Sequence, residues 1–202
     1  MFCLLSLHLL LLSYYVRAQQ TLPAGCLDAF RAAALTAHNQ FRALCGAPAL
    51  TESTTIAASA QAWATQMATT NVFAHSGSQL YGENLYGQFS SGALTSAASC
   101  STLGTTCVNS WYSEISAYNF NSPGYSDATG HYTQVVWKST TMLGMGLGWG
   151  LKSSGVNGYY CVGQYSPPGN NVSPGQFAAN VLPPMSSVST VIYKHIFLSM
   201  NL

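Results

Sequence analysis

Charged side chains are scarce in this sequence. Asp, Glu, Lys and Arg make up 5% of its 202 residues, against about a quarter in an ordinary soluble protein, and the formal net charge is +1. No acidic or basic run is present, which argues against nucleic acid as a partner and against electrostatic docking on anionic lipid. Hydrophobic residues reach 48% and aromatic residues 12%, a composition that excludes a disordered chain.

The amino-terminal apolar run is too short to span a bilayer, so we predict no stable membrane insertion. Leu4 to Leu12 instead resembles the core of a secretory signal peptide over residues 1–18, which ends on the small residues of Val16-Arg17-Ala18. We therefore predict a secreted, extracellular protein. Residues 184–202 are expected to form a loosely packed tail, because Lys194 and His195 interrupt its apolar residues.

The motifs of the common hydrolases are also missing. The sequence contains neither a nucleophile elbow nor an HExxH helix. This favours a binding protein over an enzyme. A metal-dependent hydrolase, with Glu83 or Glu114 as base and a metal-bound water as nucleophile, stays an alternative.

Five cysteines remain once the predicted signal is removed, and an exported chain should oxidise those that can pair. Cys100 and Cys107 close a short loop and are predicted to form a disulfide. Cys26 and Cys45 flank a predicted helix whose ends would lie about 28 Å apart, too far to bridge. One of Cys26, Cys45 and Cys161 should then be left over or should pair between chains.

Hydrophobic periodicity places helices early in the chain and strands late. The predicted helices are 26–45, a helix beginning within 51–55, and 107–118; the predicted strands are 132–138, 143–149 and 158–166. The segment 71–92, with a turn at 82–85, is expected to be loose, and 90–106 to be loop with some short helix. This order predicts an α+β fold in which helices pack on an antiparallel sheet.

The scarcity of charge leaves few residues that could build a polar site. The candidates are His75, Glu83, Glu114 and His131. Two imidazoles and two carboxylates converging in a groove would bind a divalent metal or act as acid and base. Separate surface or capping roles are the alternative. His38 lies on the apolar stripe of its helix and is predicted to be a hydrogen-bonded core residue.

Four motifs give the chain a resemblance to a known family. They are HNQFR at 38–42, GENL at 82–85, GHYTQVVW at 130–137 and YCVGQYSPPGN at 160–170. The chain thereby resembles the CAP superfamily of cysteine-rich secretory, antigen 5 and pathogenesis-related 1 proteins. The resemblance implies a three-layer α-β-α sandwich with a central antiparallel sheet over residues 27–183, after a short leader at 19–26.

The resemblance also implies a cleft lined by His75, His131, Glu83 and Glu114. In the family the two histidines can bind zinc or another divalent cation weakly, and the glutamates orient waters or the imidazoles. Met145 stands where many members have a cysteine, which leaves Cys161 without an obvious partner.

A finer resemblance concerns the aromatic residues before Gly130. Tyr118, Phe120 and Tyr125 are similar in spacing to the sterol-binding loop of fungal pathogen-related CAP proteins. The alternative is that these aromatics pin the loop to its own core. We predict a secreted CAP-domain protein that binds sterol or another small lipid and can bind a divalent metal. The alternatives are an extracellular defence or signalling interaction protein and the metal-dependent hydrolase.

Overall fold

The computed structural model describes residues 21–151 and 156–185. The predicted signal peptide, and the tail beyond residue 185, lie outside the described residues. The elements, in chain order, are α2 (Cys26–Leu44), β1 (Thr51–Glu52), α3 (Thr54–Thr70), β2 (Gly82–Ser90), α4 (Ala97–Ser113), a 3-10 turn η1 (Glu114–Ala117), α5 (Gly130–Val136), β3 (Met142–Leu151), β4 (Asn157–Ser166) and α6 (Gln176–Asn180).

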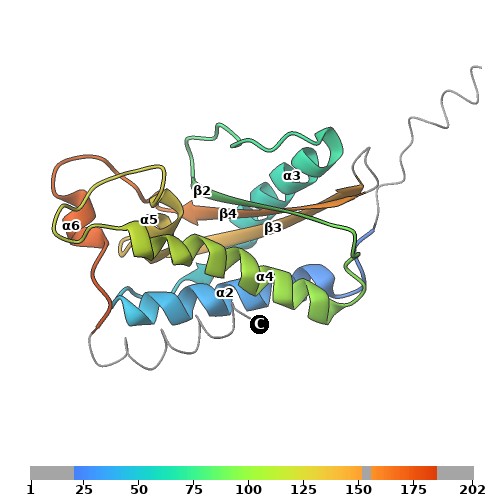
Figure 1. The fold of residues 1–202 in the computed structure, drawn as a ribbon, viewed down its shortest axis with the longest axis horizontal. Coiled ribbons are helices and arrows are strands. Elements are labelled where there is room, and N and C mark those ends of the chain that lie inside the picture. The colour runs from blue at the N-terminus through green and yellow to red at the C-terminus, as the bar shows by residue number, and fades with distance from the viewer. Residues whose placement is uncertain (1–20, 152–155, 186–202) are drawn as a thin grey trace, which may run out of the picture.

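A four-stranded sheet forms the middle layer, in the order β1-β3-β4-β2. The three long strands pair antiparallel, and only the two-residue β1 runs parallel to β3. Helix α3 covers one face of the sheet, and α2 and α4 cover the other (Figure 1). The predicted α-β-α sandwich is thereby confirmed, as are the helix from Cys26 and the strands over 143–149 and 158–166.

Strand β4 divides its side chains between the two layers, as a strand with a period of two must. Tyr159, Cys161 and Tyr165 join the core under α2 and α4. Tyr160 and Val162 join the smaller core under α3. Because helices cover both faces of the sheet, nearly the whole of β4 is buried. It contributes side chains to the cores on both sides of the sheet.

Helix α3 lies unusually close to the sheet because β3 presents it with a row of glycines. These are Gly144, Gly146, Gly148 and Gly150. A Cβ added at Gly146 would overlap the backbone carbonyl of Ala60, and one at Gly148 would overlap that of Ala64. At these contacts α3 carries alanines, so the backbone of the helix packs directly on the backbone of β3.

Arg42 ties α2 to the segment that begins at α5. It is fully buried, and its guanidinium donates to the carbonyl oxygens of Val135, Trp137 and Thr140 at 3.0, 2.9 and 2.8 Å. Desolvation lowers the Arg42 pKa to about 10. Carbonyl dipoles thus take the place of a carboxylate partner.

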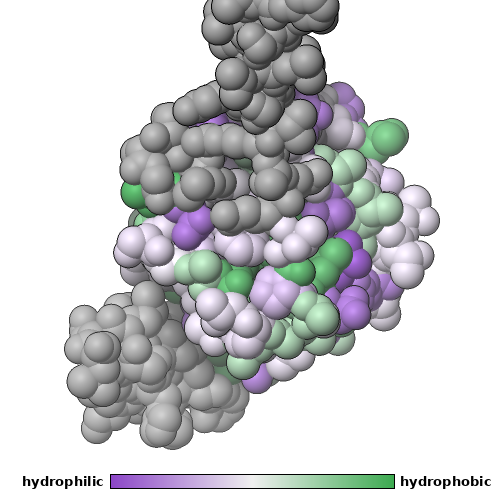
Figure 2. All heavy atoms as spheres, turned by 90° about the vertical axis from the view of Figure 1, so that its right-hand side faces the viewer, coloured by the Kyte–Doolittle hydropathy of each residue, from purple (hydrophilic) through white to green (hydrophobic). Residues whose placement is uncertain are grey.

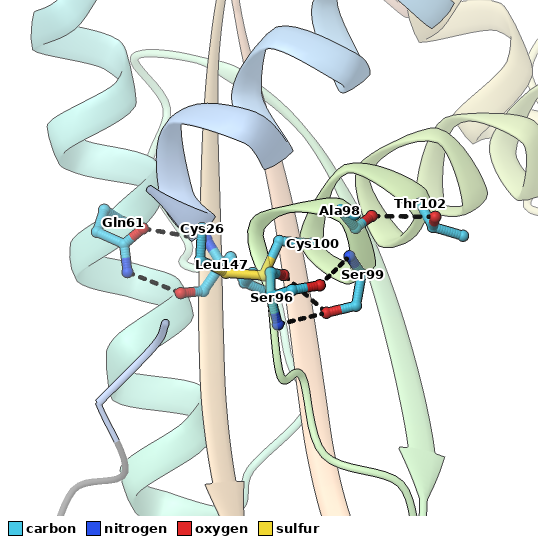
Figure 3. The surroundings of a disulfide bond; sticks show 8 residues. All are labelled: Cys26, Gln61, Ser96, Ala98, Ser99, Cys100, Thr102 and Leu147. Atoms are coloured by element: carbon cyan, nitrogen blue, oxygen red, sulfur yellow. Dashed lines mark hydrogen bonds between the residues drawn. A yellow bond between two sulfur atoms is a disulfide. The ribbon is translucent and has the colours of Figure 1, made fainter. Parts of the chain in front are cut away.

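The disulfides differ from the predicted one. Cys26 pairs with Cys100 and joins the starts of α2 and α4 (Figure 3). Cys107 pairs with Cys161 and joins α4 to β4. The prediction that Cys100 bonds Cys107 is therefore wrong. Both residues lie in α4, about two turns apart, where a bridge would have to span some 10 Å of helix. Cys45 is the free, buried cysteine among the described residues.

Gln61 of α3 covers part of the outer edge of β3, close to the Cys26–Cys100 disulfide (Figure 3). Its side-chain amide donates to Leu147 O at 2.8 Å and accepts from Leu147 N at 3.1 Å (Figure 3). These are the two bonds that a further strand would make, so Gln61 closes an edge that could otherwise pair with another chain.

Three local predictions are corrected. Residues 132–138 are not a strand, because Gly130–Val136 forms α5 and Tyr132 to Val136 are all buried. The GENL segment is not a turn, since it begins β2, whose pairing with β4 starts at Gly82. Helix α4 starts at Ala97, ten residues before the predicted start, because Ser96 and Ser99 form a capping box there.

The surface reflects the shortage of charge. The described part of the face in Figure 2 is mostly pale, the colour of intermediate hydropathy, with scattered purple and green spheres. Among residues 21–151 and 156–185, no helix is both long and apolar enough to cross a bilayer.

Candidate functional site

His131 is held by Glu114 at the start of α5. Its Nδ1 donates to Glu114 Oε1 at 2.6 Å, while Glu114 Oε2 accepts from the backbone amides of His131 and Tyr132 at 3.0 and 3.1 Å. The His131 ring stacks on Trp111, with centroids 6.4 Å apart. One carboxylate therefore caps the helix and fixes the imidazole in a single orientation.

His75 is held in the same way by Glu83, the second residue of β2. Its Nδ1 lies 2.9 Å from Glu83 Oε1, which also accepts from Ser76 N at 2.8 Å. Gln164 of β4 donates to the other carboxylate oxygen at 2.9 Å. The imidazole is 62% exposed and the carboxylate 8%, so the buried member of the pair positions the exposed one.

Burial and hydrogen bonding act in opposite senses on the pKa of Glu83. Burial raises its pKa, but hydrogen bonds from His75, Gln164 and Ser76 outweigh burial and bring the pKa down to about 2. The hydrogen bond to Glu83 raises the pKa of the His75 imidazole above its ordinary value, against a smaller opposing effect of burial. Glu83 is thus a carboxylate throughout the physiological range.

The two pairs meet at one cleft of about 340 Å³. Its lining residues are His75, Gly82, Glu83, Asn84, Tyr125, Asp127, Gly130, His131, Gln134, Gly169 and Asn170. The structure therefore brings His75, Glu83 and His131 together on its wall. Glu114 stands behind His131 and does not line the cleft.

Asp127 was not singled out as a site residue from the sequence. Asp127 is one of only five acids in the chain, and that scarcity was the one signal that could have pointed to it. Nothing in its local pattern shows that the loop before α5 folds back over the cleft.

A buried hydrogen-bond chain supports the floor of the cleft. Asn84 Nδ2 donates to His131 O at 3.0 Å and to the Tyr165 hydroxyl at 3.2 Å. Tyr165 in turn lies 2.9 Å from His38 Nε2, and His38 Nδ1 donates to Ala34 O at 2.8 Å. The prediction that His38 is a hydrogen-bonded core residue is confirmed.

The chemistry of the two imidazoles fits a cation. The Nδ1 of each histidine is hydrogen-bonded to a glutamate carboxylate, while the Nε2 of neither has a hydrogen-bond partner among the described residues. This is how histidine is presented to a metal, with the ring fixed by an outer carboxylate and the other nitrogen free. The described residues hold no group of three or more His, Cys, Asp or Glu placed to share one ion, so any such site is open and completed by water.

The predicted lipid-contact residues lie in different environments. Tyr118 is buried and packs on Tyr132, with ring centroids 5.6 Å apart, and on Phe120 at 4.9 Å. Tyr125 is 52% exposed and lines both the cleft and a neighbouring pocket of about 180 Å³. Tyr118 thus anchors the loop, and Tyr125 is the aromatic that a ligand could reach.

Comparison with known proteins places the chain in a family. Residues 35–165 match the family described as CAP, the cysteine-rich secretory protein family. The chain is therefore a CAP-domain protein, and the two clustered His–Glu pairs belong to a fold of that class.

Two curated relatives show how far the likeness extends. The human Golgi-associated plant pathogenesis-related protein 1 is 36% identical over 151 residues, covering 74% of this chain and 90% of that protein. Protein PRY2 of Saccharomyces cerevisiae is 38% identical over 156 residues, covering 76% of this chain but only 41% of that protein. The chain thus spans less than half of the yeast relative.

The fold has solved counterparts. The structure of BmVAL-1 matches with a TM-score of 0.61 and 24% identity, covering 83% of this chain and 87% of that one. At this identity the likeness concerns the fold alone.

Proposed function

We propose that this CAP-domain protein is exported and binds a divalent cation, zinc or a similar ion, through His75 and His131. The observation that carries the proposal is the shared arrangement of the two histidines: each has Nδ1 on a glutamate, and both line one cleft. Glu83 and Glu114 would orient the rings. A bound cation would supply a Lewis acid at the cleft.

Export is supported by three features. The start of the sequence resembles a signal peptide, the matched family is described as secretory, and the fold contains two disulfides. Expression of the full chain in a eukaryotic secretory host tests export, and recovery only from the cell lysate would contradict it.

Isothermal titration of the purified protein with zinc tests the cation site. The wild type should bind one ion, and both His75→Ala and His131→Ala should remove binding. Glu52→Gln is the control, since Glu52 is exposed on β1 and does not line the cleft. Unchanged zinc binding in both cleft variants would contradict the proposal.

Lipid binding is a second proposal, favoured by the exposed Tyr125 beside an apolar pocket that also includes Val172 and Phe177. At about 180 Å³ this pocket is smaller than the roughly 300–1,000 Å³ that drug-sized ligands fill. It would hold only part of a sterol, with the rest lying on the surface. Retention of labelled cholesterol should fall in Tyr125→Ala but not in Phe73→Ala, a similarly exposed aromatic on another segment.

A further inference from the structure

The acidic residues of this protein are distributed unevenly. Of the five in the sequence, three lie at the cleft: Glu83 and Asp127 on its wall and Glu114 behind His131. The other two, Asp28 and Glu52, lie at the first turn of α2 and on β1. Among the described residues, no lysine or arginine lines the cleft. Most of the acidic residues of this chain thus lie at or directly behind the wall of one cleft.

Unlike Glu83 and Glu114, Asp127 makes no hydrogen bond to a histidine among the described residues. It lines the same cleft as His75 and His131, on the side formed by the loop before α5. A turn holds it in place: Thr129 N donates to Ser126 O at 3.1 Å, and the two hydroxyls of these residues lie 2.8 Å apart. Burial and the nearby Asp127 carboxylate both raise the pKa of the Tyr125 hydroxyl. Asp127 is therefore an exposed carboxylate on the wall of the cleft that contains the two histidines.

We propose that Asp127 is a further residue of the cation site, where it raises affinity through its charge and through water bound to the ion. This inference rests on the proposed cation binding by the two histidines. Direct ligation is not part of it, because the described residues place no three His, Cys, Asp or Glu close enough to share an ion. An exposed carboxylate acts across solvent, so its effect is moderate and is screened by salt.

The test compares two single substitutions that remove the same charge. Asp127→Asn acts at the cleft, whereas Glu52→Gln removes an exposed carboxylate on β1, outside the cleft. Zinc affinity of the full chain is measured by calorimetry at about 0.01 M and about 1 M salt, where the screening length is about 30 Å and about 3 Å. Asp127→Glu restores the charge, and thermal unfolding checks that each variant is folded.

The expected result is a loss of about threefold to tenfold in affinity for Asp127→Asn at low salt, shrinking at high salt. Asp127→Glu should retain the affinity, and Glu52→Gln should match the wild type. Equal affinities of Asp127→Asn and Glu52→Gln would overturn the role of Asp127 while leaving the histidine site intact. Complete loss of binding in Asp127→Asn at both salt levels would show direct ligation and overturn the inference as stated. No zinc binding by the wild type would instead overturn the cation site, and this inference with it.

Discussion

Glu114 bonds His131 twice, through the imidazole Nδ1 at 2.6 Å and through the backbone amide at 3.0 Å. The same carboxylate therefore sets where α5 begins and how the ring at its start is turned. Because the two bonds use different oxygens, the geometry is fixed in two directions. The His131 imidazole is thus held in one orientation at the start of α5 and does not rotate freely.

Replacement of Glu114 by Gln should weaken zinc binding by about 10- to 100-fold, the usual effect of removing an outer-shell carboxylate. The amide keeps the shape of the side chain but supplies only one acceptor and no charge. Isothermal titration measures the affinity, with Glu52→Gln as a control for loss of charge alone. An affinity equal to that of the control would show that Glu114 serves only as a helix cap.

Stability should fall as the pH drops from about 6.5 toward 4, because His38 is buried as the neutral form. Desolvation is the main cause that lowers its pKa from 6.5 to about 4, outweighing the bond to Ala34 O, and nearby Arg42 lowers it further. The unfolded chain thus binds a proton in this range that the folded chain excludes, so protonation favours unfolding. At about 1.4 kcal/mol per pKa unit, the loss approaches about 3 kcal/mol.

Urea unfolding at several pH values measures this dependence. In His38→Gln the slope between pH 6.5 and 4 should largely disappear, even though the variant is less stable at neutral pH. The carboxylate of Glu83 overlaps only the acid end of this range, because its pKa falls from 4.5 to about 2 on folding and its contribution is lost below about pH 4.5. A slope that persists unchanged in the variant would assign the effect to other groups.

The disulfide pattern can be read by peptide mapping of the unreduced protein. We expect fragments joining Cys26 to Cys100 and Cys107 to Cys161. Under denaturing conditions Cys45 should alkylate without prior reduction. A fragment joining Cys100 to Cys107 would contradict this pairing.

Loss of the Cys107–Cys161 bridge, which closes 54 residues of chain, should lower the unfolding free energy by about 2–5 kcal/mol. The double variant Cys107→Ala/Cys161→Ala tests this by denaturant unfolding. Cys45→Ala is the control, since it removes a buried thiol without opening a bridge, and it should cost about 1 kcal/mol. Equal losses in the two proteins would show that the bridge adds nothing beyond packing.

The close approach of α3 to β3 predicts that Gly146 tolerates no side chain. Gly146→Ala would force a methyl group into the Ala60 carbonyl and should cost about 1–3 kcal/mol or more. Gly124→Ala is the matched control, because a Cβ there meets no atom within 4 Å, and its effect should stay within about 0.5 kcal/mol. Thermal unfolding of both variants decides the point, and equal melting temperatures would contradict the contact.

Part of this protein is determined by its sequence alone. The helical period from Cys26, ended by Gly46 and Pro48, predicts α2, and the strand pattern after residue 142 predicts β3 and β4. The scarcity of charge reduces the possible site residues to a handful. Four motifs in family order then indicate the sandwich and contain Glu83 and His131, while the family resemblance adds His75 and Glu114. The sequence thus gives the identity of these residues but not their geometry.

The tertiary structure decided the rest, because those features depend on neighbours distant in the chain. The run from Tyr132 to Val136 is buried on all sides, so its apolar residues show no period that separates helix from strand. Strand β2 exists because β4 pairs with it, and Cys107 bonds the cysteine that packing brings to it rather than the one nearest in sequence. Asp127 reaches the cleft only because its loop folds back over it. Local pattern fixes what a segment can form, while long-range packing selects which partner it meets.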